Sequence, residues 1–175
     1  LRKNILTVRR DDLLESMNLD PKYPVPSLFS IDGTPCDCVI LAIDGFVSHN
    51  GDPLPNLCIS GINVGPNLSV DLLHSGTVSG AREASLYGVP SIASSIAKHD
   101  PNIDPTDAVE ITVDLAERLL KIIQSPLPNL RRPNKSESAI HWDGEDSTIA
   151  QMFSHGDIFL NLNIPENCSR KIVAA

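Results

Sequence analysis

Aromatic residues and basic charge are both scarce in this chain of 175 residues. Phe, Trp and Tyr together make up 4% of the sequence, so we expect a core built from Leu, Ile, Val and Ala. The chain has 14 Lys and Arg against 22 Asp and Glu, which gives a formal net charge of −8. A chain of this sign is repelled by polyanions. The composition therefore argues against a nucleic-acid polymer or an anionic membrane as the main partner.

Long apolar runs and paired cysteine motifs are also missing. No run approaches the ~18–20 apolar residues that a membrane-spanning helix needs, and the first residues show no secretory signal. We therefore expect a cytoplasmic protein that spans no membrane. The four cysteines include a C-x-C pair but no C-x-x-C metal knuckle. They are predicted to be reduced, small core residues, and they are Cys36, Cys38, Cys58 and Cys168.

Short apolar runs alternate with stretches of helical periodicity along a chain that is long enough for one domain with its own core. Strands that alternate with helices form a parallel sheet that carries helices on both faces. The sequence therefore predicts an α/β fold in which residues 1–175 form a single domain. The predicted strands are Ile5–Val8, Leu28–Ile31, Leu57–Ser60, Val89–Ala93 and Asp157–Ile164.

Capping residues mark the start of the first predicted helix. Thr34 suits the N-cap position, Pro35 suits the first helical position, and Asp37 follows three residues after the cap. The apolar run Cys38–Ile43 is predicted to supply the buried side of this helix.

Two further helices and a polar insertion complete the predicted order. The second helix covers 77–87, and Gly88 stops it. The third covers 106–124, and residues 125–156 show no periodicity, so they are predicted to be an insertion or loop. The buried positions predicted for the third helix lie at three-to-four spacing and are Ala108, Ile111, Thr112, Leu115, Leu119, Ile122 and Ile123.

The Gly-rich segment Gly61–Gly76 lies where open parallel sheets bind ligands, beyond the carboxyl end of a strand. Asn63 and Asn67 offer neutral carboxamide oxygens, which suit Mg²⁺, Mn²⁺ or Ca²⁺. Ser75-Gly76-Thr77 offers hydroxyls and backbone N–H groups at a helix start, a seat for phosphate. The pattern is neither a P-loop nor G-x-G-x-x-G. The same residues also make ordinary turns and caps, so the pattern alone leaves both interpretations open.

Several blocks around this loop resemble the SurE family of survival-protein phosphatases, also called 5'/3'-nucleotidases. Asp32–Val39 resembles the family's G-T-P-x-D-C-V block, and Phe159–Pro165 resembles its L-N-x-N-x-P strand. The blocks follow one another in family order across residues 31–97 and 157–165. The longest matching blocks are Ile59–Asn67, Ser75–Ala84 and Tyr87–Ala93.

The resemblance implies a specific chemistry. SurE proteins have a Rossmann-like, three-layer fold with a parallel sheet, and they hydrolyse phosphate monoesters, typically nucleoside monophosphates, with a divalent metal, Mg or Mn. By this resemblance Asn63 is a metal ligand, and Ser75, Gly76 and Thr77 line the phosphate site. Asn67 borders the same pocket, where it would bind substrate. Full-length members are expected to form homo-oligomers.

The sequence also departs from the family pattern. The metal-binding Asn-Asp-Asp-Gly motif and the metal-binding Ser of the next loop have no counterpart, and we interpret Asp11-Asp12 as a solvated turn. His74 stands where the family usually has Tyr. We therefore expect a sheet that is incomplete at the N-terminus and at the C-terminus.

These departures leave more than one functional hypothesis. The first is a metal-dependent phosphatase or nucleotidase whose remaining metal ligands lie upstream. The second is a truncated, catalytically inactive homologue that acts as a binding or interaction module. An unrelated nucleotide-binding domain with similar turns is a third and weaker one.

Overall fold

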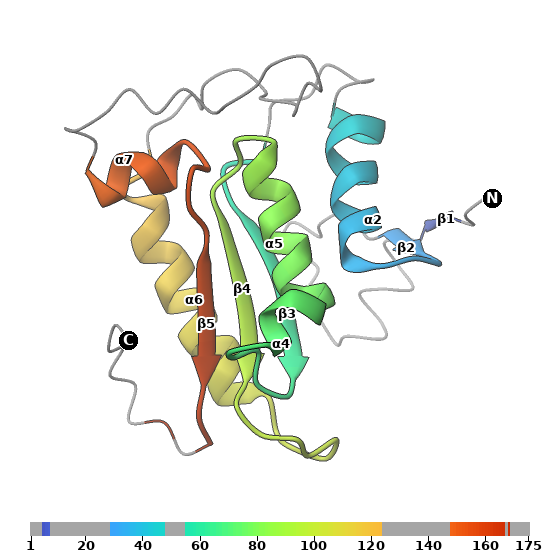
Figure 1. Ribbon diagram of the computed structural model, residues 1–175, viewed down its shortest axis with the longest axis vertical. Coiled ribbons are helices and arrows are strands. Elements are labelled where there is room, and N and C mark those ends of the chain that lie inside the picture. The colour runs from blue at the N-terminus through green and yellow to red at the C-terminus, as the bar shows by residue number, and fades with distance from the viewer. Residues whose placement is uncertain (1–4, 8–28, 48–54, 124–147, 167, 169–175) are drawn as a thin grey trace, which may run out of the picture.

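The computed structural model describes residues 5–7, 29–47, 55–123, 148–166 and 168. Within them, three parallel strands form one sheet in the order β3-β4-β5 (Figure 1). β3 spans Cys58–Val64, β4 spans Ser91–Ile96 and β5 spans Leu160–Ile164. The predicted α/β class and the parallel sheet are confirmed.

Helices cover both faces of this sheet. Neighbouring side chains of a strand point to opposite faces, and β4 shows where each points. The Ser91 hydroxyl donates to the Ala81 carbonyl of α5 (Gly76–Leu86) at 2.7 Å, whereas the Ser94 hydroxyl contacts the Thr112 hydroxyl of α6 (Thr106–Leu120) at 2.8 Å. The sheet therefore lies between α5 and α6, which makes the three layers of the predicted architecture.

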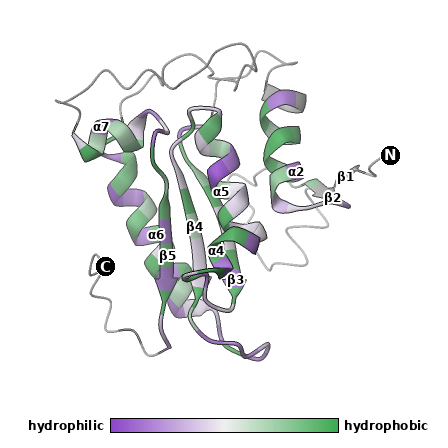
Figure 2. Ribbon diagram, in the orientation of Figure 1, coloured by the Kyte–Doolittle hydropathy of each residue, from purple (hydrophilic) through white to green (hydrophobic). Residues whose placement is uncertain are grey.

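The central strand β4 carries the core, and all six of its residues are buried. On the α5 face, Ala93 packs against the buried Val78 and Ala81. On the α6 face, Ile96 packs against Ala108 and Ile111. Figure 2 shows hydrophobic segments on the strands between the helical layers. The core therefore consists of small aliphatic side chains, as the scarcity of aromatic residues predicts.

Two short strands stand apart from the parallel sheet. β1 (Ile5–Thr7) pairs antiparallel with β2 (Phe29–Ile31), and neither pairs with β3, β4 or β5. The sequence predicts both strands correctly. The two strands hydrogen-bond to each other and form a separate two-stranded sheet.

The first helix begins as predicted. α2 (Pro35–Ile40) has a capping box in which Thr34 Oγ1 accepts from the Asp37 N–H at 3.3 Å and Asp37 Oδ2 accepts from the Thr34 N–H at 2.8 Å. A π-helical segment, Leu41–Val47, continues the helix. α2 itself packs against α5.

The predicted buried side of α2 is partly wrong. Ile43 is buried and Val39 packs against its cluster, but Cys38 and Ile40 are exposed. The reason is that α2 and its continuation pack on one side only. Val39 and Ile43, which lie four residues apart, are on that side. All four cysteines are free, as predicted, but only the half-buried Cys58 and Cys168 pack against core clusters, so the prediction of core positions fails for Cys36 and Cys38.

Several elements differ from the sequence prediction, and β4 and β5 begin two and three residues later than predicted. β3 continues through 61–64, which were expected to belong to the loop, and a short helix, α4 (Asp71–His74), follows before α5. The predicted insertion contains a helix, α7 (Ile149–Ser154). Its capping box, Thr148 with Gln151, is readable in the sequence and was missed. Residues 125–147 of the predicted insertion lie outside the described part of the chain.

The predicted helices 77–87 and 106–124 are confirmed in position, although α6 ends at Leu120. Gly88 follows α5 with φ +80°, the left-handed conformation that glycine adopts most easily. Of the predicted buried positions of α6, only Ile122 is clearly exposed, and the neighbouring Ile123, also beyond the end of the helix, is buried.

Candidate functional site

Strand register brings three polar side chains into one row at the carboxyl edge of the sheet. Asn63 of β3 pairs with Ser95 of β4, and Ser95 pairs with Asn163 of β5. Ser95 lies four residues after Ser91, so it faces α5 like Ser91. The row therefore lies on the α5 face, at the edge from which α5 itself begins (Figure 1).

The carboxamide of Asn63 is oriented by its own loop. Asn63 is half-buried, and its Nδ2 donates to the carbonyl of Gly65 at 2.8 Å. This bond leaves Oδ1 as the acceptor of the side chain, and no described residue donates to it. The geometry is compatible with the predicted role of Asn63 as an oxygen ligand.

Asn67 lies deeper than its predicted role requires. It is 5% exposed, and its Nδ2 donates to Ser95 Oγ at 2.6 Å. Its backbone N–H donates to Asn163 Oδ1 at 2.8 Å, and its carbonyl accepts from Asn161 Nδ2 at 2.9 Å. The described residues thus engage both the side chain and the backbone of Asn67.

The predicted phosphate seat lies at the N-terminus of α5. Ser75 is the N-cap, and its Oγ accepts from the Val78 N–H at 3.1 Å. No described residue accepts a hydrogen bond from the N–H groups of Gly76 and Thr77. Gly76 is exposed and Thr77 is half-exposed, so both amides can face an anion. The positive end of the helix dipole favours negative charge at this place.

Two glycines let α2 approach this helix end closely. A Cβ on Gly76 would lie 3.2 Å from Pro35 Cδ, and a Cβ on Gly80 would lie 2.7 Å from Ser60 Oγ and 3.1 Å from Pro35 Cβ. Gly76 and Gly80 are one helical turn apart and therefore share one side of α5. The packing fixes the predicted phosphate seat between β3 and the start of α2.

A histidine that the sequence analysis did not single out also reaches this edge. The His99 ring lies against Gly65, since a Cβ on Gly65 would come within 2.7 Å of its Cε1 and Nδ1 atoms. His99 is exposed and follows β4, the neighbour of β3. Its place after a central strand was the signal available in the sequence. His74, in contrast, is exposed on α4.

The described residues do not by themselves complete a metal site. Among them, no three His, Cys, Asp or Glu side chains gather as metal ligands. Asn63 supplies one neutral oxygen, whereas a hard divalent cation takes about six oxygen ligands. Asp11 and Asp12 lie outside the described residues.

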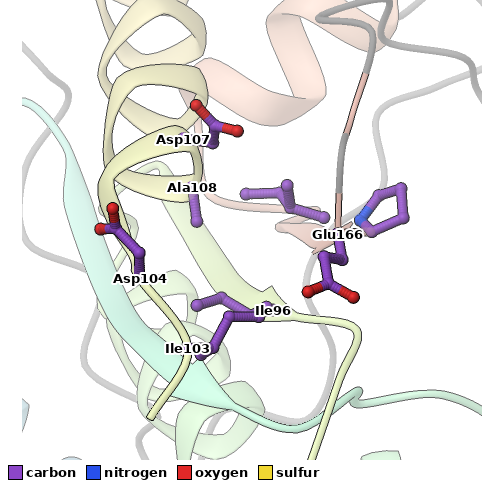
Figure 3. Close-up of a pocket in the computed structure, with 8 residues that line it drawn as sticks. Ile96, Ile103, Asp104, Asp107, Ala108 and Glu166 are labelled. Carbon is purple, nitrogen blue, oxygen red and sulfur yellow. The ribbon is translucent and has the colours of Figure 1, made fainter. Parts of the chain in front are cut away.

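A cavity of about 180 Å³ opens on the opposite face of the same edge, between α6 and the end of β5 (Figure 3). Its polar lining is acidic and comes from Asp104, Asp107 and Glu166, above a floor that includes Ile96 and Ile164. Carboxylates repel phosphate at neutral pH. This cavity is therefore unsuited to the chemistry that the α5 face favours.

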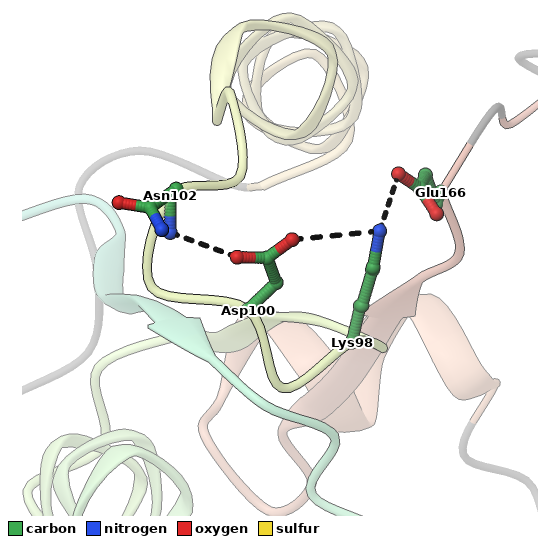
Figure 4. A network of polar contacts seen from close by, with 4 residues as sticks. All are labelled: Lys98, Asp100, Asn102 and Glu166. Atoms are coloured by element: carbon green, nitrogen blue, oxygen red, sulfur yellow. Dashed lines mark hydrogen bonds and ion pairs between the residues drawn. The ribbon is translucent and has the colours of Figure 1, made fainter.

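An ion-pair network around Lys98 lies at the carboxyl edge of the sheet, next to the cavity (Figure 4). Lys98 Nζ lies 2.7 Å from Glu166 Oε1 and 3.6 Å from Asp100 Oδ2. The hydrogen bond to Glu166 raises the pKa of Lys98, and partial burial, the next cause, opposes this rise without reversing it. Lys98 thus joins the loop after β4 to the segment after β5. Its charge is paired with carboxylates, so it is not available to bind phosphate.

No helix in the described part of the chain is long and apolar enough to cross a membrane. The expected cytoplasmic location remains a prediction.

Comparison with known proteins places these features in a family. The profile described as "Survival protein SurE" matches residues 6–175. The 5'-nucleotidase SurE of Methylococcus capsulatus is 43% identical over 98 residues, which are 56% of this chain and 36% of that protein. The 5'-nucleotidase SurE of Methanothrix thermoacetophila is 44% identical over 115 residues, 64% of this chain and 41% of that protein.

A solved structure agrees with the sequence matches. The crystal structure of the SurE protein from Aquifex aeolicus superposes with a TM-score of 0.55 at 32% identity. The match covers 83% of this chain and 45% of that chain. This chain therefore spans less than half the length of the relatives named here.

Proposed function

Because this chain belongs to the SurE family, we propose that it binds the phosphate of a phosphate monoester at the N-terminus of α5 and serves its hydrolysis. A nucleoside monophosphate is the proposed substrate, since the matched relatives are named 5'-nucleotidases. The observation that carries the proposal is the pair of available N–H groups on Gly76 and Thr77, which lies on the same face of the sheet as Asn63.

The residues of the α5 face have distinct proposed roles. The N–H groups of Gly76 and Thr77 donate to phosphoryl oxygens, and the helix dipole stabilises their negative charge. Ser75 fixes the helix start through its bond to the Val78 N–H, and its own hydroxyl proton can be donated to the same oxygens.

A divalent metal, Mg or Mn, is part of the proposal for the enzyme. It would neutralise phosphate charge when bound. Asn63 offers it one oxygen, and no three His, Cys, Asp or Glu side chains of the described residues gather as further ligands, so we infer that the remaining ligands come from elsewhere. Association of several copies is likewise proposed from the family and is testable by analytical ultracentrifugation.

The single metal ligand among the described residues favours a second candidate function. A chain that holds phosphate but lacks a complete metal site would be a catalytically inactive binding module. The two functions differ in one measurement. The enzyme releases phosphate from AMP with Mn²⁺, whereas the module binds inorganic phosphate and releases none.

A matched pair of variants tests the phosphate seat. Ser75 has φ −73° and ψ 122°, a backbone that tolerates a following proline, and proline is favoured as the first residue of a helix. Gly76→Pro therefore removes one N–H without breaking α5, and Gly76→Ala adds the same Cβ but keeps the N–H. We expect Gly76→Pro to weaken inorganic phosphate binding about tenfold relative to Gly76→Ala.

The readout is a phosphate titration followed by amide shifts at Thr77 and Val78. Equal affinity in the two variants would refute the proposed seat. Release of phosphate from AMP, measured with and without Mn²⁺, then decides between the enzyme and the binding module.

A further inference from the structure

Three side chains of β4 and β5 bind Asn67: those of Asn161 and Asn163 contact its backbone, and that of Ser95 contacts its carboxamide. Asn161 and Asn163 lie two residues apart on β5 and point to the same face. Ser95 lies beside Asn163 on β4. Asn67 belongs to the loop that connects β3 to α5. The contact therefore joins this loop to a strand 94 to 96 residues further along the chain.

The carboxamide of Asn163 bonds to both polar backbone groups of Asn67, as the backbone of a neighbouring strand would. Its Oδ1 accepts from the Asn67 N–H at 2.8 Å, and its Nδ2 lies 3.3 Å from the Asn67 carbonyl. Asn161 donates to the same carbonyl at 2.9 Å. The loop at Asn67 is thus held to β5 much as another strand would be, although β5 forms no ladder with it.

Ser95 fixes the orientation of the Asn67 side chain. Its Oγ accepts from Asn67 Nδ2 at 2.6 Å, and Ser95 is fully buried. With the side chain and both backbone groups bound, Asn67 has one orientation. Buried networks of this kind define a single conformation when every member is satisfied, and no described buried side-chain N or O atom lacks a partner.

We propose that Asn161, Asn163 and Ser95 are positioning residues that act through Asn67 to hold the loop 65–74, and with it the start of α5, in its phosphate-binding geometry. The idea rests on the proposed function of that helix end. Asn67 links the Asn63 end of the loop to the Ser75 end. A shift of Asn67 therefore moves the two halves of the site relative to each other.

Two serines of β4 give a matched test. Ser95→Ala removes the bond to Asn67, whereas Ser94→Ala removes a buried bond of similar length to Thr112 on the other face. Both serines are 0% exposed, so the two variants lose comparable stability. Asn161→Leu is a second test, because Asn161 is exposed and its replacement costs little folding energy.

The measurements use the full chain, with inorganic phosphate as the probe. We expect Ser95→Ala and Asn161→Leu to weaken phosphate binding about tenfold, and Ser94→Ala to change it less than about twofold. Hydrogen exchange of the amides 67–71 should quicken in the first two variants only. Thermal melts confirm that all three variants fold.

Each outcome is decisive. Faster exchange with unchanged phosphate affinity would overturn the positioning role and leave the proposed function standing. An equal loss of phosphate affinity in Ser94→Ala and Ser95→Ala would show that the loss comes from lower overall stability. This outcome would also overturn the positioning role. A wild-type chain that binds no phosphate would refute the proposed function, and the positioning role would fall with it.

Discussion

The two faces of the sheet carry opposite chemistry at the same carboxyl edge. The α5 face presents carboxamides, hydroxyls and the N–H groups of a helix start, all of them neutral. The α6 face presents the carboxylates of Asp104, Asp107 and Glu166 around a cavity. An anion is attracted to the first face and repelled by the second. The acidic cavity is therefore not the better candidate site for phosphate.

The two faces also differ in packing. α5 approaches β3 and α2 through glycine and alanine, and Ala81 and Ala84 are fully buried. α6 has larger side chains with exposed flanks, and Val109 and Val113 are 45% and 47% exposed. Close packing leaves little room for adjustment. We therefore expect substitutions on the α5 face to have the larger effects.

The sharpest test of this difference is Gly80→Val. A Cβ on Gly80 already falls 2.7 Å from Ser60 Oγ, so a valine has to displace α5 from β3. We expect a loss of ~3 kcal/mol in the free energy of unfolding, measured by urea denaturation. The control is Val113→Ala on the exposed flank of α6, which should cost less than ~0.5 kcal/mol. Similar losses would show that the two faces are packed alike.

A second test uses the buried thiol of the α5 face. Burial raises the pKa of Cys58 to about 11, from 9.0 in the unfolded chain. The folded state therefore keeps its proton between pH 9 and 11 while the unfolded state loses it. Stability is present below pH 9 and declines by ~2 kcal/mol as the pH rises to 11.

Cys58→Ala should remove this pH dependence, and Cys38→Ala, at an exposed position, should retain it. Denaturant unfolding at pH 8.5 and 10.5 gives the comparison. A slope that persists in Cys58→Ala would assign the dependence to another group.

On the α6 face, Thr112→Val should have a moderate effect. Thr112 Oγ1 donates to the Ala108 carbonyl at 2.7 Å and contacts Ser94 Oγ at 2.8 Å, so valine leaves the buried Ser94 hydroxyl without its partner. We expect a loss of ~1–2 kcal/mol by thermal or urea unfolding. The double variant with Ser94→Ala should recover part of it. Additive losses in the double variant would contradict this coupling.

The smallest expected effect lies in the loop of the α5 face. Ser69 has φ +54°, a left-handed conformation that costs energy for any residue with a Cβ. Ser69→Gly should therefore raise stability by ~0.5 kcal/mol, and Ser69→Val should lower it. Thermal unfolding of the two variants distinguishes the outcomes. Destabilisation by Ser69→Gly would mean that the serine side chain matters more than the backbone.

Local signals predicted the elements well where a cap or a stop is encoded. Thr34 with Asp37, and Gly88, mark helix ends that the structure confirms. Local signals failed where packing on one side decides the outcome, as for the exposed Cys38 and Ile40 on α2. They also failed for β3, because pairing with β4 extends this strand into residues that read as a loop.

The candidate site shows the same division. Motif order placed Asn63 and the Ser75 to Thr77 segment on one loop, and the structure brings them to one face of the sheet. The proximity of His99 to Gly65 was not readable, since it depends on which strands are neighbours.

The sequence by itself determined the alternation of strands and helices, the helix caps and the family, because these depend on residues near one another along the chain. Only the tertiary structure decided that Asn67 turns inward to Ser95 and that Asn161 and Asn163 hold its backbone. The reason is the strand register, since Ser95 and Asn163 become neighbours only when β4 and β5 pair in parallel. The same pairing placed the acidic cavity on the face opposite the proposed phosphate seat.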